Sequence, residues 1–466
     1  MTPPLPVSAS AANEPTARAT GPASPKPGPT PRIAESAPDH TPTGPRLRVL
    51  VEAFATSPYR GSESGGGWNV VRRLAEHHDV TVLCFPGYGR DAVEALDRHV
   101  AEHGPVSGLT VHWVEQPPLS RLFQREGAWQ RAFYYHGYRA WEKRALRVAR
   151  RLHAERPFDL VHRLNMTGFR EPGFLHEMGL PYAWGPIAGA VMMPKPFFRL
   201  LSPRDRAFYR VRNVLNARQM RTKRRCRTAA AAADRLWAVD ELNRAMVREH
   251  FGAQAEIMLD SACEPNAEGF VRSYTGQTPL RVLWSGVHEG RKCLPILLHA
   301  LAVLRDEGRA IALTVLSEGR ETASWKRLAS SLNLDDMIEW TGILPHGRAV
   351  ARMRDSDVFV LTSLQEAATH VVMESLASGL PVVCHDACGM GIAVDETCGL
   401  KIPLVDPETS ITGFADALRE LLDRPERIDE LSAGALARSR ELSWAGKAAR
   451  IAAAYREMVG VAPKPG

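Results

Sequence analysis

The chain has 466 residues, more than a single hydrophobic core usually spans, so we expect two or three folding units. Hydrophobic residues make up 44% of the sequence, and no apolar run approaches the roughly 18 residues that a membrane span needs, which argues against a membrane-spanning protein. The net charge of +7 arises from one segment, residues 199–227, without an aromatic and basic motif for reading nucleic acid, so we expect no nucleic-acid partner.

Residues 1–45 differ from the rest of the chain because they are almost entirely Pro, Ala, Ser, Thr and Gly. Such a segment cannot bury enough apolar surface to offset the entropy that folding costs. It also lacks the basic start and the apolar region of about 7–15 residues that a secretory signal has. We predict a disordered leader without a targeting role.

A first domain is predicted over residues 46–265, where short β-branched runs alternate with amphipathic segments. This alternation is typical of a parallel sheet with helices on both faces, so we expect a doubly wound, Rossmann-like α/β domain. The predicted strands are 46–54, 78–85, 109–115 and 158–164, and the predicted helices include 67–78 and 141–153.

Two features of this domain are candidates for function. Gly65 and Gly66 lie in a glycine-rich loop before a predicted helix, and glycine lets a ligand approach the backbone closely. The loop does not supply G-x-G-x-x-G with an acidic residue after the second strand, so a dehydrogenase is a distant alternative. His162 ends a predicted strand at the edge where α/β sheets bind ligands, and a purely structural histidine is an equal alternative.

The basic segment 199–227 carries eleven Arg or Lys residues and one Asp, interleaved with Phe, Leu, Tyr and Val at loosely helical spacing. This pattern predicts a basic amphipathic helix. Such a helix either rests on an anionic membrane surface or joins two domains with its arginine stems covering apolar surface, and we favour the second reading.

A second Rossmann-like domain is predicted over residues 266–440, followed by a helix within 441–461. Gly286 lies near the end of the first predicted strand of this domain, and Arg291 and Lys292 stand at the start of the next helix. These two cations either bind a ligand or simply point into solvent. The predicted strands are 280–287, 310–319, 337–344, 356–363 and 380–385.

Two aspartates, Asp355 and Asp357, have the spacing of a metal-binding pair. They directly precede a buried strand, where a turn or capping role is the better interpretation. We therefore predict no metal.

The segment 363–391 is the most informative, because a strand, a loop, a helix and a second strand follow one another within it. Glu366 lies in the loop, Thr369 is a candidate N-cap, and the helix is predicted from His370 to Ser378, before Gly379. The first amides of a helix lack intrahelical partners and meet the positive end of its dipole, so a diphosphate can bind there without a metal.

Seven cysteines, an odd number scattered over strands and loops, indicate a reducing compartment, and we expect a cytoplasmic protein, peripheral to the inner face of the membrane if 199–227 contacts lipid. Cys384, Cys388 and Cys398 lack the spacing of a four-ligand zinc site.

The spacing of Glu366 and Glu374, followed by the sequence ASGLPVV, resembles the signature of the retaining GT-B glycosyltransferases of family four, which include glycogen-synthase-like and phosphatidylinositol-mannosyltransferase-like enzymes. The resemblance implies two Rossmann-like domains facing a cleft. It also implies that Glu366 reaches the donated sugar and Glu374 the nucleoside. The family's Gly-Phe-Gly after the first glutamate is replaced here by Ala367, Ala368 and Thr369.

The same resemblance assigns the remaining donor-site residues. Lys292 stands where the family has a phosphate-binding lysine, whereas the family's arginine after Gly286 is Val287 here, so we expect Arg291 to supply that charge. The other residues expected at the donor are Gly319, Ile343, Thr369, His370 and Val371. On the first domain, Gly65, Gly66 and His162 are expected near the acceptor and the transferred sugar, and 441–461 is expected to cross back to that domain.

The function implied is transfer of a hexosyl unit, with retention and without a metal or other cofactor, from a nucleotide diphosphate sugar to a glycan, a lipid-linked sugar or a small metabolite. The catalytic residues expected are Glu366, His162 and Lys292. Two alternatives remain open: a sugar-nucleotide epimerase of the same fold, and a protein that binds nucleotide sugars without turnover.

Overall fold

The computed structural model describes residues 44–87, 92–117, 128–266, 269–366 and 369–460. The predicted leader 1–45 therefore lies almost wholly outside the described residues, and so do Ala367 and Ala368.

The first domain is built on a seven-stranded parallel sheet with the order β3-β2-β1-β4-β5-β6-β7. All its paired strands are parallel, as the alternation of strands and helices predicts. The strands are β1 Arg48–Glu52, β2 Asp79–Cys84, β3 Leu109–Trp113, β4 Leu160–Arg163, β5 Tyr182–Ile187, β6 Arg235–Ala238 and β7 Glu256–Ile257. The helices are α1 Ser62–His77, α2 Ala92–His103, α4 Ala128–Glu155, α5 Pro203–Thr222, α6 Arg224–Ala231 and α7 Glu241–Met246, with short turns η2 Leu175–Met178, η3 Lys195–Leu200 and η4 Val247–Phe251.

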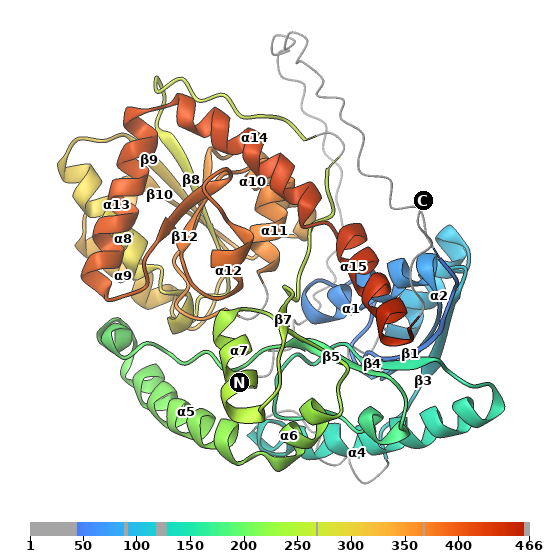
Figure 1. Ribbon diagram of the computed structural model, residues 1–466. Helices are drawn as coiled ribbons and strands as arrows, with labels where there is room; N and C mark the ends of the chain where they lie inside the picture. Colours follow the sequence, from blue (N-terminus) through green and yellow to red (C-terminus); the bar gives the residue numbers. More distant parts are fainter. Residues whose placement is uncertain (1–43, 88–91, 118–127, 267–268, 367–368, 461–466) are drawn as a thin grey trace.

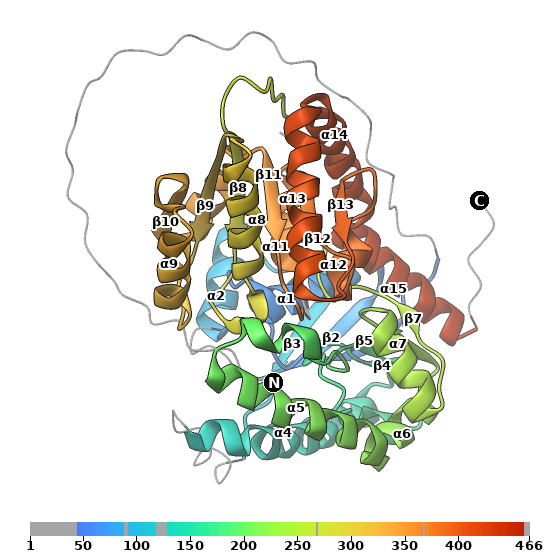
Figure 2. The ribbon, with the colours of Figure 1, turned by 90° about the vertical axis from the view of Figure 1, so that its left-hand side faces the viewer.

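The second domain is built on a six-stranded parallel sheet with the order β10-β9-β8-β11-β12-β13. Its strands are β8 Leu280–Ser285, β9 Ile311–Leu316, β10 Ile338–Gly342, β11 Val358–Leu361, β12 Val382–His385 and β13 Gly399–Ile402. Its helices are α8 Pro295–Asp306, α9 Thr322–Ser331, α10 His346–Arg354, α11 His370–Ala377, α12 Cys388–Ala393, α13 Pro407–Asp423 and α14 Glu426–Glu441, with turns η5 Gly290–Lys292 and η6 Asp335–Met337. The chain thus has the two doubly wound domains predicted from its sequence (Figures 1 and 2).

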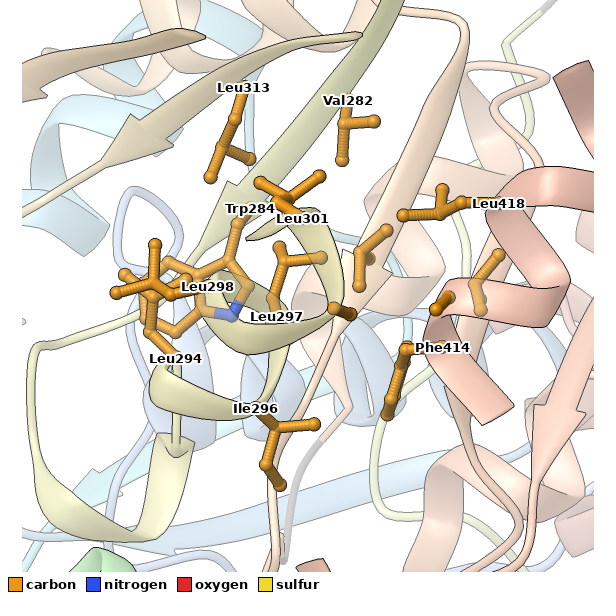
Figure 3. Packing of buried hydrophobic residues seen from close by; sticks show 14 of the residues in the cluster. Val282, Trp284, Leu294, Ile296, Leu297, Leu298, Leu301, Leu313, Phe414 and Leu418 are labelled. Carbon is orange, nitrogen blue, oxygen red and sulfur yellow. The ribbon is translucent and has the colours of Figure 1, made fainter. Parts of the chain in front are cut away.

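The core of the second domain shows why its first helix forms. Helix α8 begins with Pro295, which suits a first helical turn, and continues with the apolar residues Ile296, Leu297 and Leu298. These side chains are fully buried and pack with Trp284 of β8 (Figure 3). Apolar burial on this scale fixes the turn before α8 against the sheet.

The last helix, α15 Trp444–Met458, packs on the first domain and not on the second, where the chain has just come from. Figure 1 shows it beside α1. Trp444 and Tyr455 are buried in the same hydrophobic cluster as Trp68 of α1 and Trp237 of β6. The chain therefore passes between the domains twice.

The basic segment 199–227 is not one helix, as its pattern predicts, but parts of η3, α5 and α6. Ser202 caps α5 by accepting a hydrogen bond from the Asp205 amide, and Lys223 ends it. Phe197, Leu201 and Tyr209 pack into the hydrophobic core of the second domain. Asp205 forms an ion pair of 2.8 Å with Arg320. The start of this segment therefore joins the two domains.

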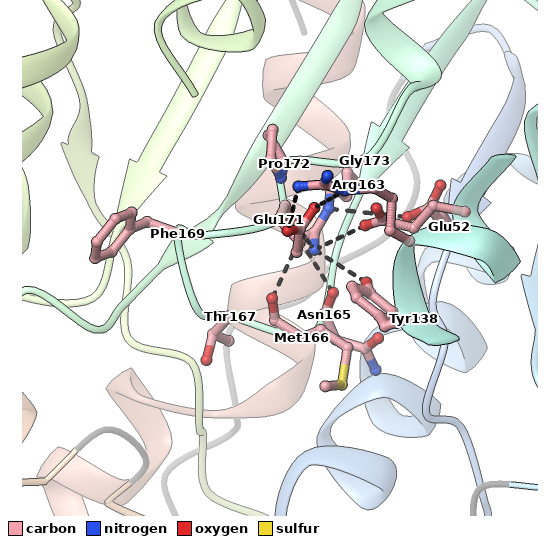
Figure 4. A network of polar contacts seen from close by, with 12 residues as sticks. Glu52, Tyr138, Arg163, Asn165, Met166, Thr167, Phe169, Glu171, Pro172 and Gly173 are labelled. Atoms are coloured by element: carbon pink, nitrogen blue, oxygen red, sulfur yellow. Dashed lines mark hydrogen bonds and ion pairs between the residues drawn. The ribbon is translucent and has the colours of Figure 1, made fainter. Parts of the chain in front are cut away.

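A buried polar network fixes the loop after β4 (Figure 4). Arg163 donates hydrogen bonds to the carbonyls of Asn165 and Met166, both at 3.2 Å, and to the carbonyl of Glu171. Burial raises the pKa of Glu52 to about 7 and that of Glu142 to about 8, although Arg163 lies 3.8 and 3.5 Å from their carboxylates and opposes the shift.

In the part of the chain that the structure describes, no helix combines the length and the apolar character needed to cross a membrane.

Candidate functional site

The loop and helix after β11 take the order that the sequence predicts. Helix α11 starts at His370, ends at Ala377, and is followed by Gly379 with a φ of +64°. Thr369 occupies the N-cap position, but its side chain does not cap the helix as expected. Its hydroxyl lies 3.0 Å from that of Ser261 at the end of the first domain, so it links the domains instead.

The turn η5 lies against the end of β11. The amide of Leu364 donates to the carbonyl of Arg291 at 2.8 Å, and the hydroxyl of Thr362 donates to the carbonyl of Lys292 at 2.9 Å. Gly286 faces the aliphatic part of Lys292, where an added Cβ would lie 3.2 Å from Cδ. A glycine at 286 therefore leaves room for the lysine side chain.

Lys292 and Glu366 form a direct ion pair at this point, and the guanidinium of Arg291 lies 3.3 Å from both oxygens of Glu366. Burial lowers the pKa of Lys292. Burial also acts to raise the pKa of Glu366, but Lys292 and Arg291 outweigh it and hold that pKa below its usual value. Glu366 is therefore ionised at neutral pH.

Lys292 has unused hydrogen-bonding capacity. An ammonium group carries three donors, and among the described residues its nitrogen bonds only to Glu366. Two donors consequently remain for an anionic ligand.

Glu374 lies one turn into α11 and is half-buried, with one carboxylate oxygen 4.0 Å from the ring of His346. Burial raises its pKa. Its neighbours at the helix start, His370 and Val371, are also half-buried. This face of α11 is therefore accessible to a ligand.

The two residues expected beside the base, Gly319 and Ile343, flank the ends of β9 and β10. An added Cβ at Gly319 would lie 2.6 Å from the carbonyl oxygen of His288, so only glycine fits there. Ile343 is 74% exposed. Neither residue contacts the ion pair of Lys292 and Glu366 in the described structure, so their assignment to the donor remains a prediction.

On the first domain, Gly65 and Gly66 lie inside α1, which begins at Ser62, and not in a loop before the helix as the sequence analysis expects. A Cβ on Gly66 would lie 3.9 Å from the ring of His370 and 3.5 Å from Trp444. Gly66 therefore marks the place where α1 meets the start of α11.

His162 does not line this region, so the expectation of a catalytic or acceptor-side role is corrected. Its ring is fully buried, with Nδ1 2.6 Å from the hydroxyl of Tyr455 and Nε2 2.9 Å from the carbonyl oxygen of Gly185. Burial lowers its pKa to about 4. Because both nitrogens have partners, we assign His162 to the packing of β4 against α15.

Asp357, the second residue of the aspartate pair, has a structural role. Asp357 is buried and accepts hydrogen bonds from the Arg281 amide at 2.8 Å and from the Arg281 guanidinium at 2.6 and 3.0 Å. The described residues contain no group of three or more His, Cys, Asp or Glu arranged to hold a metal ion.

Sequence reasoning missed two residues beside the ion pair. Gln365 accepts a hydrogen bond of 2.7 Å from Arg212 of α5, and its carbonyl accepts one of 3.2 Å from Arg291. The position of Gln365 next to Glu366 was a usable signal. Arg212 was hidden among the eleven basic residues of 199–227.

Comparisons with known proteins agree with this geometry. Residues 272–438 match the family model of glycosyl transferases group 1. A D-inositol 3-phosphate glycosyltransferase of Corynebacterium efficiens is 31% identical over 169 residues, which cover 35% of this chain and 39% of that relative. The match thus spans less than half of the relative's length.

Two solved structures show the same arrangement of both domains. Sucrose-phosphate synthase from Thermosynechococcus elongatus aligns with a TM-score of 0.59 at 16% identity, over 90% of this chain and all of that chain. The Anabaena protein HepE, in complex with UDP, aligns with a TM-score of 0.53 at 13% identity, over 87% of this chain and 98% of that chain. The chain therefore has the GT-B fold, and residues 272–438 of its second domain are similar to the glycosyl transferases group 1 family.

Proposed function

We propose that this protein is a glycosyltransferase that moves a hexosyl unit from a nucleotide diphosphate sugar to an acceptor. The observation that carries the proposal is the buried pair of Lys292 and Glu366, with Arg291 beside it, next to the start of α11. Two cations and a helix N-terminus suit a diphosphate. A carboxylate in the same place suits sugar hydroxyls, because an ionised carboxylate only accepts hydrogen bonds.

In the proposed mechanism, the diphosphate takes the spare donors of Lys292 and the amides at the start of α11. Glu366 then accepts hydrogen bonds from the sugar, and Glu374 from the nucleoside. As the sugar departs, negative charge grows on the diphosphate, and Lys292 and Arg291 stabilise it from fixed positions. Catalysis is mainly positioning and electrostatic stabilisation.

We propose that transfer retains the anomeric configuration. The acceptor attacks on the face from which the diphosphate leaves, and the leaving phosphate takes the acceptor's proton. This route needs no covalent nucleophile, which fits a Glu366 carboxylate held between two cations. It also needs no metal or other cofactor, because protein cations supply the positive charge.

We propose further that the exposed face of α5 touches an anionic membrane surface. Val211 and Val214 are 60% and 70% exposed, between Arg210 and Arg218. An apolar stripe flanked by arginines favours the boundary between lipid headgroups and chains. Flotation with vesicles of phosphatidylglycerol and phosphatidylcholine tests this proposal, and equal recovery of wild type and a Val211→Ser, Val214→Ser variant would contradict it.

The donor is identified by thermal unfolding with UDP-, GDP- and ADP-sugars. A ligand at a hundred times its dissociation constant stabilises the folded state by about 2.7 kcal/mol. UDP-sugars are tested first, since the Anabaena protein was crystallised with UDP. Product analysis then separates the alternatives: an epimerase changes the sugar nucleotide without an acceptor, and a binding protein leaves it intact.

A further inference from the structure

A hollow of about 230 Å³ lies between α5 and the beginning of α4, which run next to each other in both views (Figures 1 and 2). The side chains of Arg170 and Arg212 line its polar side. Phe208, Val211 and Leu215 line its apolar side.

Arg212 has a charge that nothing in the described structure neutralises. Its guanidinium donates to the neutral side chain of Gln365, and it forms no ion pair with any described carboxylate. Its Nε is buried without a hydrogen-bond partner. Burial lowers the pKa of Arg212, and the nearby charges of Arg170 and Arg291 act in the same direction. A buried donor of this kind is costly unless a ligand satisfies it.

Arg170, on the same polar side of the hollow, is held in place by its neighbours. It donates to Gln219 at 2.5 Å and to the side chain of Asn216, whose amide in turn donates to the Gly189 carbonyl at 3.1 Å. Arg170 also belongs to the loop that Arg163 fixes through backbone carbonyls (Figure 4). The two guanidiniums therefore need little rearrangement to receive an anion.

The hollow adjoins the donor site through one residue. Gln365 bonds to Arg212 with its side chain and to Arg291 with its carbonyl, and it directly precedes Glu366. Arg212 and Gln365 thus connect the hollow to the residues that we assign to the donated sugar.

We propose that this hollow is the acceptor subsite and that the acceptor carries a phosphate group, bound by Arg212 and Arg170, next to an apolar portion on Phe208, Val211 and Leu215. The planar guanidinium matches phosphate oxygens in pairs, which makes arginine the residue suited to this ligand. The inference rests on the proposed function. The phosphate can belong to a soluble ester or to a lipid headgroup.

The test measures binding of two probes to the full chain without a donor: glycerol 3-phosphate by calorimetry, and phosphatidic acid in phosphatidylcholine vesicles by sedimentation. We expect at least one probe to bind, and Arg212→Gln to weaken that binding by about ten- to a hundredfold. Arg212→Lys keeps the charge but not the planar fork of the guanidinium. Its affinity for the probe should lie between those of the wild type and Arg212→Gln. Arg327→Gln is the matched control, because this exposed arginine of α9 in the second domain lies outside both the hollow and the exposed face of α5.

Binding of glycerol 3-phosphate that depends on Arg212 identifies a soluble acceptor, and binding of vesicles alone that depends on Arg212 identifies a lipid acceptor. The proposal is overturned if neither probe binds, or if Arg212→Gln, Arg212→Lys and Arg327→Gln all bind as the wild type does. Since the assay needs no turnover, Arg212-dependent binding in a protein that transfers no sugar would overturn the proposed function alone. Donor turnover with probe binding that is independent of Arg212 would overturn this inference alone.

Discussion

Each of the two domains buries a cation beside carboxylates. We assign the cluster of the first domain to stability and the cluster of the second domain to ligand binding, because the two cations differ in their partners. In the first domain Arg163 is enclosed, and four of its donors reach three backbone carbonyls and the hydroxyl of Tyr138. In the second domain Lys292 bonds only to Glu366 among the described residues and lies near a helix start. Arg163 is enclosed by the protein, although its Nε lacks a hydrogen-bond partner, so we assign it to the stability of the fold. Lys292 keeps spare donors next to a helix start, where they are available to a ligand.

The largest expected effect is on stability, from Arg163→Met. Removing one partner of a buried ion pair typically costs about 3–5 kcal/mol. Urea unfolding should show this loss, while the variant that remains folded binds donor as the wild type does. Arg98→Met is the control and should cost much less stability, because the Arg98 side chain is 66% exposed and its ion pair with Glu102 lies at the surface. Similar losses of stability in Arg163→Met and Arg98→Met would mean that the buried Arg163 cluster stabilises the fold no more than a surface ion pair does.

Lys292→Ala should instead reduce activity rather than stability. We expect turnover to fall by about ten- to a thousandfold, because the ammonium stabilises charge that grows in the transition state. Arg291→Ala should cost less, and Lys401→Ala, at a surface pair with Asp386, should leave turnover unchanged. Steady-state kinetics on folded variants measure this. Unchanged turnover in Lys292→Ala together with lost turnover in Arg291→Ala would mean that Arg291 holds the phosphate.

At the proposed donor site, Glu374→Gln should weaken nucleotide affinity by about tenfold, which is the scale of one hydrogen bond to a charged group. Glu366→Gln should instead slow transfer while the donor still binds. Titration with the nucleotide and single-turnover kinetics distinguish the two. Equal losses of nucleotide affinity in both variants would contradict the division of roles.

A smaller effect concerns pH. Burial lowers the pKa of His162 to about 4 from its ordinary 6.5, so between these values the unfolded chain binds a proton that the folded chain does not. Stability should therefore fall as the pH falls through this window, by up to about 1.4 kcal/mol per pH unit for this residue. His162→Gln should make the dependence of stability on pH shallower. The same slope in wild type and variant would show that His162 is protonated in the folded state.

No effect is expected from removing metals. Activity in excess chelator should equal activity without it, because Lys292 and Arg291 supply the charge that a divalent ion supplies elsewhere. Donor turnover with and without chelator measures this. An absolute requirement for Mg²⁺ or Mn²⁺ would rule out the metal-independent mechanism.

Local patterns predicted much of the fold because most predicted strands are buried runs that contain β-branched residues. Strands β1 and β8 lie inside the segments 46–54 and 280–287. Strands β5, β6, β7 and β13 were not among the predicted strands. A run as short as Glu256–Ile257 of β7 carries no periodicity.

The candidate site likewise has residues that local sequence could predict and residues that it could not. The loop of Glu366 was predictable because its strand, loop and helix are adjacent in sequence. His162 was misjudged because its partner Tyr455 lies 293 residues away, and no local pattern records that contact. Arg212 was missed for a similar reason, since its bond to Gln365 joins the two domains.

The return of α15 to the first domain has a consequence for synthesis. The buried residues of α15, among them Trp444 and Tyr455, complete a core whose remaining members leave the ribosome before the second domain is made. At about 5–20 residues per second, the interval is on the order of ten to forty seconds. During that time the surface of α1 that α15 later covers is exposed to chaperones. The domain that is translated first is thus the last to be finished.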